Sequence, residues 1–233
     1  MSFLFNELLF RPIFNVLVSL YNIIPGSDFG VAILVLTFFI RLLFFPLTVK
    51  SLVAQKELAR LQPELKKLQD KYKNDKQQLG AATMALYKEH KINPLSGCLP
   101  LLVQLPVLFA LFKALGVAFN PDSLSLIYGF ITKPEVINNI SFKFINLEIA
   151  NRPMAILAGV LQWFQAKITQ KNQGHDQKGQ QSQMALMSKQ MLYFFPIMVI
   201  IISWNFPAGV VLYWVATNAL SIAEQFIVGR KTA

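Results

Sequence analysis

Residues 29–49 read FGVAILVLTFFIRLLFFPLTV, and this stretch decides the fold class. It contains one charged residue, Arg41, which stands 13th among its 21 residues. A helix needs roughly 20 mostly apolar residues to cross about 30 Å of hydrocarbon. The stretch therefore predicts a membrane-spanning helix that carries an arginine near the middle of the bilayer.

The composition of the whole chain is typical of a membrane protein. Of its 233 residues, 54% are hydrophobic and only 15% are charged, and the mean hydropathy is +0.45. Soluble domains carry about 25% charged residues, and disordered chains are far less hydrophobic. A single cysteine excludes a disulfide scaffold. The net charge of +10 would suit a nucleic-acid-binding domain, but this hydrophobicity would not, so no specific nucleic acid partner is expected.

The remaining apolar runs predict an all-α, polytopic membrane protein with five transmembrane helices. Proline and glycine in the run Asn205–Gly209 divide the last apolar block into two spans. The spans are expected at residues 28–50, 94–119, 152–169 and, as the fourth and fifth together, 191–228. The connecting segments are 1–27, 51–93, 120–151 and 170–190, followed by a tail at 229–233.

Two of the predicted spans have short apolar runs, Pro153–Ile168 and Met191–Trp204. Sixteen helical residues measure about 24 Å, which is less than the hydrocarbon thickness. Short third and fourth spans beside a thinned bilayer are therefore expected.

The N-terminal segment, residues 1–27, predicts an amphipathic helix. Arg11, Asn15, Ser19 and Asn22 are spaced four, four and three apart, so they share one helical face. Such a helix is expected to lie in the membrane interface rather than to cross the bilayer. A signal peptide is the alternative, which the absence of a basic start and of a small-residue cleavage site disfavours.

Lysine and arginine predict the orientation. Sixteen of them fall in residues 50–91, 167–189 and the tail, whereas four fall in the segments on the opposite side. Cytoplasmic loops of membrane proteins carry the excess of these residues. The N-terminus is therefore expected outside and the C-terminus in the cytoplasm, with 120–151 as an extracytoplasmic loop and 170–190 as a cytoplasmic one.

Residues 51–93 predict a cytoplasmic hairpin of two amphipathic helices. Leucines and a tyrosine follow a heptad spacing through the first half, and Pro63 suggests that a helix breaks or starts there. A second, weaker stripe follows Asp75. The residues expected in the hairpin seam are Leu58, Leu61, Leu65, Leu68 and Tyr72 in the first stripe, and Leu79, Thr83, Leu86, Tyr87 and His90 in the second. A solubilising connector is the alternative, but the segment is far longer than a connection requires.

Arg41 needs an explanation because a charge at this depth costs at least about 2.5–3.5 kcal/mol. No acidic residue is expected at a matching depth, because Glu224 falls near the cytoplasmic end of the fifth span. A water-filled cavity around Arg41 is therefore the interpretation. Other polar or aromatic residues inside spans could line it: Thr37, Gln104, Gln162, Gln165, Ser203, Trp214, Thr217, Asn218 and Ser221. The alternative is that they join helices through hydrogen bonds.

Several ordered motifs resemble the YidC/Oxa/Alb family of membrane protein insertases. The resemblance covers nearly the whole chain. It rests on residues 40–48 (IRLLFFPLT), 61–65 (LQPEL), 84–88 (MALYK), 93–100 (NPLSGCLP) with 104–106 (QLP), and 206–209 (FPAG) with 212–214 (LYW) and Asn218.

The resemblance implies a fold, a function and a site. It implies a five-helix core with a cytoplasm-open hydrophilic groove built around Arg41, in which Thr37, Gln165 and Trp214 match groove positions. The family's hairpin is thought to receive substrates, which are nascent membrane proteins. It further implies a bacterial cell-membrane protein that is not an enzyme and uses no cofactor or metal, with membrane lipids, the ribosome and a Sec-type translocon as further candidate partners.

Some features of the family are absent from this chain. The additional N-terminal span, the large periplasmic domain and the long basic tail of some members have no counterpart, so a minimal core is expected. Two rival functions remain. One is a solute or ion transporter, which would need a polar relay across the membrane. The other is a ribosome- or lipid-binding scaffold, which would need no groove.

Overall fold

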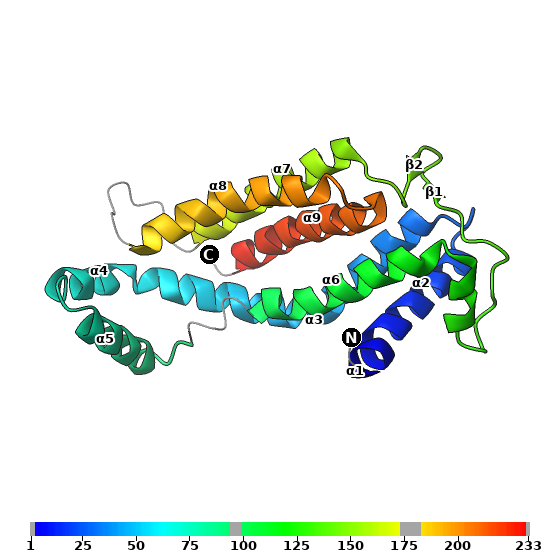
Figure 1. Ribbon diagram of the computed structural model, residues 1–233. Helices are drawn as coiled ribbons and strands as arrows, with labels where there is room; N and C mark the ends of the chain where they lie inside the picture. The colour runs from blue at the N-terminus through cyan, green and yellow to red at the C-terminus, as the bar shows by residue number, and fades with distance from the viewer. Residues whose placement is uncertain (1–2, 94–98, 173–182, 232–233) are drawn as a thin grey trace.

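The computed structural model describes residues 3–93, 99–172 and 183–231. Five helices lie alongside one another in an elongated bundle, as Figure 1 shows. They are α3 (Phe29–Arg60), α6 (Leu99–Ala118), α7 (Arg152–Asn172), α8 (Gln183–Ser203) and α9 (Ala208–Lys231). The expected all-α fold is confirmed.

The connecting segments gather at the two ends of this bundle (Figure 1). At one end is a hairpin of α4 (Gln62–Lys71) and α5 (Lys76–Glu89). At the other end lie α1 (Phe3–Phe5), a π-helical turn (Asn6–Phe10), α2 (Arg11–Ile23), a 3₁₀ segment (Pro121–Leu126) and the strands β1 (Ile140–Ser141) and β2 (Ile145–Asn146). The strands are antiparallel, with Ile140 opposite Asn146 and Ser141 opposite Ile145.

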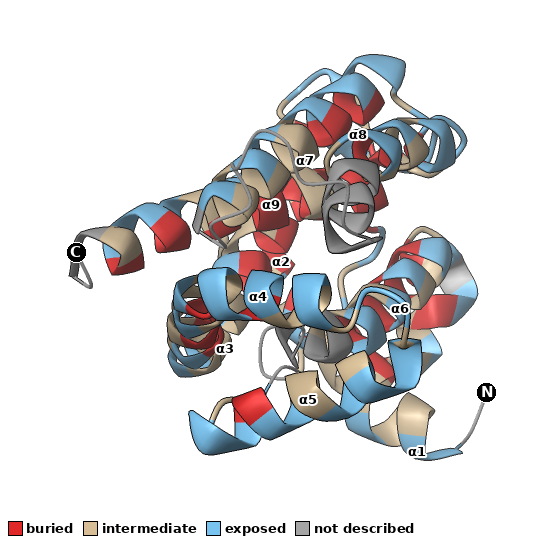
Figure 2. Ribbon diagram, turned by 90° about the vertical axis from the view of Figure 1, so that its left-hand side faces the viewer, coloured by how far each residue is buried: buried red, intermediate tan, exposed pale blue. Residues whose placement is uncertain are grey.

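Apolar side chains cover the outside of the bundle as well as its interior. Val199, Val210 and Val211 are fully or almost fully buried. Many large apolar side chains are instead exposed. Examples are Leu42, Leu43, Phe109, Ile197 and Ile201. Exposed residues are pale blue on the ribbon in Figure 2. Soluble proteins rarely expose apolar patches this extensive, so the bundle is suited to a surrounding of lipid.

Three helical segments among the described residues are long and apolar enough to cross a membrane: Phe3–Ile23, Phe29–Arg60 and Ala208–Gly229. Shorter apolar stretches are Gln104–Ala118 and Leu192–Ser203. The number of five spans stays a prediction. The helices α7 and α8 have 21 residues each, or about 31 Å, and are longer than their apolar runs. The short third and fourth spans stay a prediction. Polar residues extend both helices beyond their apolar runs.

Helix α3 is longer than its predicted span. It runs without interruption for 32 residues, or about 48 Å, whereas the hydrocarbon core is about 30 Å thick. The backbone therefore shows no break at the predicted boundary between residues 50 and 51. The C-terminal part of α3 instead forms a helical stalk that carries the α4–α5 hairpin.

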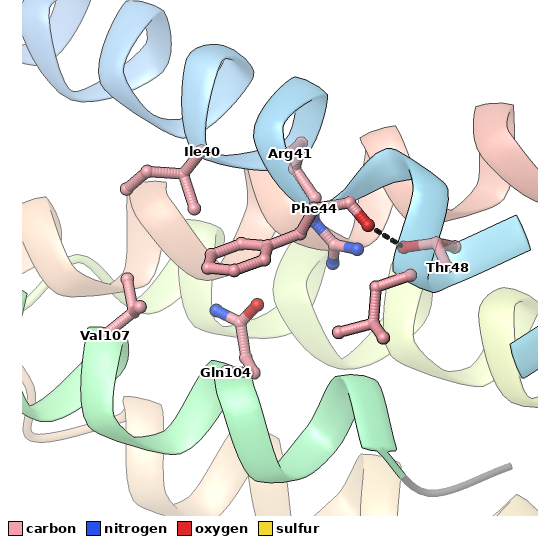
Figure 3. A pocket seen from close by; sticks show the side chains of 7 residues that line it. Ile40, Arg41, Phe44, Thr48, Gln104 and Val107 are labelled. Carbon is pink, nitrogen blue, oxygen red and sulfur yellow. Dashed lines mark hydrogen bonds between the residues drawn. The ribbon is translucent and has the colours of Figure 1, made fainter. Parts of the chain in front are cut away.

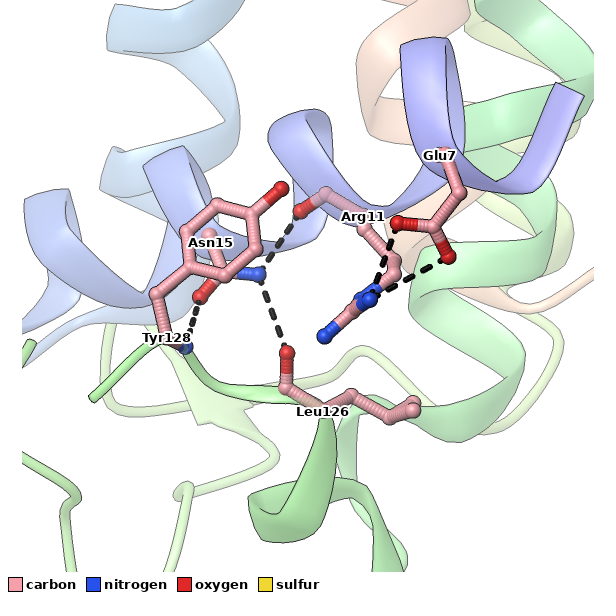
Figure 4. Close-up of polar contacts among 5 residues, drawn as sticks. All are labelled: Glu7, Arg11, Asn15, Leu126 and Tyr128. Carbon is pink, nitrogen blue, oxygen red and sulfur yellow. Dashed lines mark hydrogen bonds and ion pairs between the residues drawn. The ribbon is translucent and has the colours of Figure 1, made fainter. Parts of the chain in front are cut away.

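The polar face of the N-terminal helix is covered by the loop 120–151 rather than left open. Asn15 Nδ2 donates to the backbone oxygen of Leu126 (3.1 Å), and its Oδ1 accepts from the backbone nitrogen of Tyr128 (2.7 Å; Figure 4). Arg11 pairs with Glu7 (2.9 Å), and its guanidinium lies over the Tyr128 ring. The polar stripe therefore binds this loop, and the interfacial position of the helix stays a prediction.

Asp28 joins the start of α3 to the β hairpin. Its Oδ1 accepts from the backbone nitrogens of Gly30 (2.9 Å) and Val31 (3.1 Å), which caps the helix. Its Oδ2 accepts from the backbone nitrogen of Phe142 (2.6 Å). Gly30 is needed here, because an added Cβ would lie 2.7 Å from Ser141 Oγ. One carboxylate thus holds both the helix and the loop.

Replacing Asp28 with alanine is expected to lower the free energy of unfolding by about 1–2 kcal/mol, because the helix loses its cap. Asp28→Asn is the matched control. It keeps an oxygen for the cap, but its amide NH2 cannot accept from Phe142. Thermal unfolding in detergent measures the stability, and limited proteolysis measures the attachment of the loop. Equal stability of Asp28→Ala and the wild type would contradict this role.

The turn before α9 is held by the same loop. The backbone nitrogens of Ala208 and Gly209 donate to the oxygens of Ile149 and Leu147, both at 2.9 Å. An added Cβ on Gly209 would lie 3.1 Å from Leu115 of α6. The FPAG motif therefore satisfies the first N–H groups of α9 and lets α6 approach closely.

Candidate functional site

Arg41 forms an ion pair with α9. Its Nη1 lies 3.2 Å from Glu224 Oε2, and its Nη2 donates to the backbone oxygen of Thr217 (3.1 Å) and to Ser221 Oγ (2.5 Å). The side chains of Arg41 and Glu224 are only 15% and 9% exposed. The expectation that Arg41 lacks an acidic partner is therefore wrong, whereas the water-filled cavity stays a prediction.

Two features of the helices explain this pairing. Thr217, Ser221 and Glu224 are spaced four and three apart, so they form one stripe on the face of α9 that meets α3. Counted from the first residue of its own helix, Glu224 lies only four residues further along α9 than Arg41 lies along α3. Four residues correspond to about 6 Å along a helix. The arginine side chain is long enough to cover this difference. An estimate of depth in the membrane from the Cα positions alone therefore fails to predict the Arg41–Glu224 pair, because it ignores the length of the side chains.

A cleft lies beside Arg41, between α3 and α6. Arg41 and Gln104 project toward it from the two helices (Figure 3). Its lining is otherwise mostly apolar. The residues lining it are Ile40, Arg41, Phe44, Leu47, Thr48, Gln104 and Val107. Gln104 Nε2 also donates to the hydroxyl of Tyr213, a buried residue of α9. The structure thus brings Arg41 and Gln104 together.

The other predicted groove residues lie elsewhere. Thr37 is 1% exposed, and its hydroxyl donates to the Ile33 oxygen of its own helix (2.6 Å). Trp214 Nε1 donates to Gln162 Oε1 (3.4 Å) between α9 and α7. Gln165 lies half-buried further along α7. None of these four residues lines the cleft beside Arg41. Their contact with a substrate stays a prediction.

Further polar contacts join α7 to α9 at the same interface. Asn218 Nδ2 donates to the Ala158 oxygen (3.3 Å), and Thr169 Oγ1 donates to Gln225 Oε1 (3.2 Å). Interhelical hydrogen bonds of this kind hold membrane helices together. The contact between Trp214 and Gln162 fits this structural role as well as a role in a groove.

Sequence reasoning places Thr217 and Ser221 among the candidate lining residues but misses Glu224 as the partner of Arg41. The signal was available in their spacing, which forms a polar stripe on an otherwise apolar helix. Helix α3 carries a similar polar stripe, formed by Thr37 and Arg41, which are four residues apart. Two polar stripes on apolar helices are expected to face each other, because neither can face lipid without cost.

A second basic residue within a predicted span, Lys113 of α6, is also paired. Its Nζ donates to Asn6 Oδ1 (2.7 Å) and lies 4.3 Å from the centroid of the Phe10 ring. A cation over an aromatic face is attracted by the ring quadrupole. The N-terminal helix therefore stabilises this charge at the end of the bundle opposite the hairpin.

The hairpin has a small hydrophobic core of its own. Leu61, Leu65, Leu86 and Tyr87 are at most 9% exposed and pack together, separate from the core of the bundle. Leu58 packs against them from the last turn of α3, not from the hairpin. Pro63 lies in the first turn of α4, as expected. Asp75 caps α5 through the backbone nitrogens of Gln77 and Gln78.

Replacing Leu65 with alanine is expected to unfold the hairpin locally, because a buried leucine truncated to alanine costs about 2–5 kcal/mol and this core is small. The bundle should keep its melting temperature. Protease sensitivity of residues 61–92 measures the local effect. Met84→Ala is the control, since Met84 is 51% exposed on α5. Equal protease resistance of the Leu65 and Met84 variants would be incompatible with this core.

Two stretches of earlier interest lie outside the described residues. They are residues 94–98, which belong to the NPLSGCLP motif, and residues 173–182, which are the middle part of the predicted cytoplasmic loop 170–190.

Comparisons with known proteins point to one family. Residues 19–233 match the family described as "60Kd inner membrane protein". A Fusobacterium nucleatum protein named membrane protein insertase YidC is 38% identical over 207 residues, which are 89% of this chain and 89% of that protein. Proteins of the same name from Treponema denticola and Pelobacter propionicus are 39% and 34% identical. They match 90% and 94% of this chain, but the chain spans only 35% and 38% of their length.

A solved structure shows the same fold. It is described as an active YidC insertase with the first transmembrane domain resolved. The match covers 96% of this chain and 46% of that one, with a TM-score of 0.62 and 23% identity. The family and the apolar helices together place the protein in the bacterial inner membrane.

The match over residues 19–233 and the nearly full-length relative agree with the ordered motifs of the sequence. The chain therefore belongs to the 60Kd inner membrane protein family, the family of the non-enzymatic YidC membrane protein insertases.

Proposed function

We propose that this protein inserts nascent membrane proteins into the bilayer and helps them to fold, with the cleft beside Arg41 as the entry point for polar segments. The observation that carries this proposal is a cationic group held between expected membrane helices at the edge of a cleft. Family membership supports the activity, and the geometry supports its location.

The mechanism follows from the position of Arg41. A polar outer segment of the substrate enters the cleft between α3 and α6, where Arg41 and Gln104 offer hydrogen-bond donors. Electrostatic attraction is stronger there than in bulk water, because the surroundings have a low dielectric constant. The apolar segment of the substrate then moves into lipid, which contributes about 25 cal/mol per Å² of apolar area buried. No nucleotide-binding motif occurs in the sequence, so this burial and the membrane potential are the proposed sources of free energy.

The hairpin is proposed to receive substrates on the cytoplasmic side. The basic residues of 50–91 support this orientation, and so does the position of the hairpin at the same end of the bundle as the C-terminus (Figure 1). The N-terminus would then lie outside. Nascent membrane proteins are the partners implied by the function, and contacts with the ribosome or a Sec-type translocon remain candidates.

Crosslinking to a stalled nascent chain tests the function. A photoreactive residue at Gln104 is expected to crosslink to the polar segment of the substrate, because Gln104 lines the cleft. The same probe at Leu105 is the control, since Leu105 is the neighbouring residue and is 40% exposed. Crosslinks from Leu105 but not from Gln104 would contradict entry through the cleft.

Cysteine labelling separates the insertase from its two rivals. In a Cys98→Ser background, Thr48→Cys places a thiol in the cleft. Labelling by a membrane-impermeant reagent from the cytoplasmic side alone supports the insertase. Labelling from both sides supports a transporter, and no labelling from either side supports a scaffold without a groove.

A further inference from the structure

Among the described residues, Arg41 and Glu224 form the one ion pair that links two predicted spans. The other two ion pairs join Arg11 to Glu7 and His90 to Glu64 at the ends of the bundle. The Arg41–Glu224 pair lies beside the cleft that the proposed function assigns to substrates. Any charge preference of the cleft must therefore depend on both members of the pair.

The guanidinium is held by α9 at several points. Its Nη1 faces Glu224, and its Nη2 faces Ser221 Oγ and the Thr217 oxygen. Its Nε is buried and has no hydrogen-bond partner among the residues that the structure describes. Arg41 therefore enters the cleft with most of its donors occupied and its charge balanced by a carboxylate 3.2 Å away.

We propose that Glu224 keeps the cleft from selecting acidic segments, because it neutralises Arg41 until an acidic group of the substrate takes the place of the Glu224 carboxylate. This inference rests on the proposed insertase function. An acidic group of the substrate meets a neutral pair, in which repulsion by Glu224 offsets attraction by Arg41. The acidic group gains the attraction of Arg41 only by displacing Glu224. The wild-type cleft is then tolerant of both charges rather than selective for acidic segments.

The reason is the short separation of the two charges. At distances larger than the separation, the opposite contributions of Arg41 and Glu224 nearly cancel, since each falls off with distance in the same way. Specificity in charged sites depends on such repulsive partners as much as on attractive ones. Removing the carboxylate alone would convert a tolerant cleft into a cationic one.

Glu224→Gln tests this directly. Glutamine keeps the shape of the side chain and an oxygen that accepts from Arg41 Nη1, but it carries no charge. Purified protein in vesicles without a membrane potential is given single-span substrates with two Asp, two Asn or two Lys in the outer tail. The Asp-to-Asn insertion ratio of Glu224→Gln is expected to rise on the order of fivefold over wild type, and insertion of the Lys substrate to fall.

The controls separate charge from folding. Glu89→Gln removes one negative charge from an exposed position on the hairpin and should leave the ratio unchanged. An Asp-to-Asn ratio for Glu224→Gln within twofold of wild type, at an unchanged melting temperature, overturns the proposal while leaving the insertase function standing.

If Glu224→Gln does not fold, the wild-type protein tests the proposal by itself. Its Asp and Lys substrates should insert within about threefold of each other, and a strong preference for Asp overturns the proposal. Insertion of no substrate by the wild type overturns the insertase function itself.

Discussion

Arg41→Ala is expected to lower the insertion of substrates with acidic outer tails by on the order of tenfold, the largest functional effect we foresee from a single substitution. The loss is expected because the negative charge of Glu224 remains when Arg41 is removed. Without Arg41, Glu224 lies nearly buried and unpaired beside the cleft and repels acidic groups. The same substitution should lower the stability of the protein, because removing one partner of a buried ion pair costs about 3–5 kcal/mol. Insertion into proteoliposomes and thermal unfolding measure the two effects.

The double variant Arg41→Ala/Glu224→Gln separates attraction from repulsion. If repulsion by Glu224 dominates, the double variant should recover much of the insertion that Arg41→Ala loses, and the effects of the two substitutions should be strongly non-additive.

Arg41→Lys should retain part of the insertion activity, because lysine keeps the charge but cannot span three acceptors as a guanidinium does. Normal insertion of acidic substrates by Arg41→Ala would refute the role of this residue.

Gly159→Ala is expected to lower the free energy of unfolding by about 1–3 kcal/mol, although alanine favours helices. Gly159 of α7 faces α8, where an added Cβ would overlap Ile200 and lie 3.1 Å from the Pro196 oxygen. A backbone oxygen cannot move aside as a flexible side chain can. The two helices must therefore separate, and thermal unfolding in detergent should show the loss.

Gly116→Ala is the matched control for this substitution. Gly116 also lies within a helix, α6, but an added Cβ there has nothing within 4 Å. Alanine should therefore leave stability unchanged or raise it by up to about 1 kcal/mol, as its helix propensity requires. Equal effects at both glycines would show that α7 and α8 are not packed as closely as described.

Local patterns explain why so much of the fold is predictable. The apolar run around Arg41 predicts a spanning helix, because the thickness of the membrane imposes a length on any apolar helix. Leu61, Leu65, Leu86 and Tyr87 pack together in the hairpin as expected, with Leu58 contributed by α3 instead. The lengths of α7 and α8 were not predictable from apolar runs, since a helix can continue through polar residues once the membrane no longer limits it.

The site was less predictable than the fold, and Glu224 shows why. Its distance along α9 suggested a depth different from that of Arg41, yet the two side chains meet. Trp214 and Gln162 were expected in the same cavity as Arg41, but they contact each other between α7 and α9. Depth and polarity can be read along a chain, whereas the neighbour of a side chain depends on how helices are rotated and packed.

The sequence by itself thus determined the class of protein, its helices and the arginine that requires an explanation. These depend on interactions between residues near one another in the chain and on the thickness of the bilayer. Only the tertiary structure decided the partner of that arginine. Arg41 and Glu224 are 183 residues apart, and an ion pair over this separation exists only because α3 and α9 pack with their polar stripes facing each other.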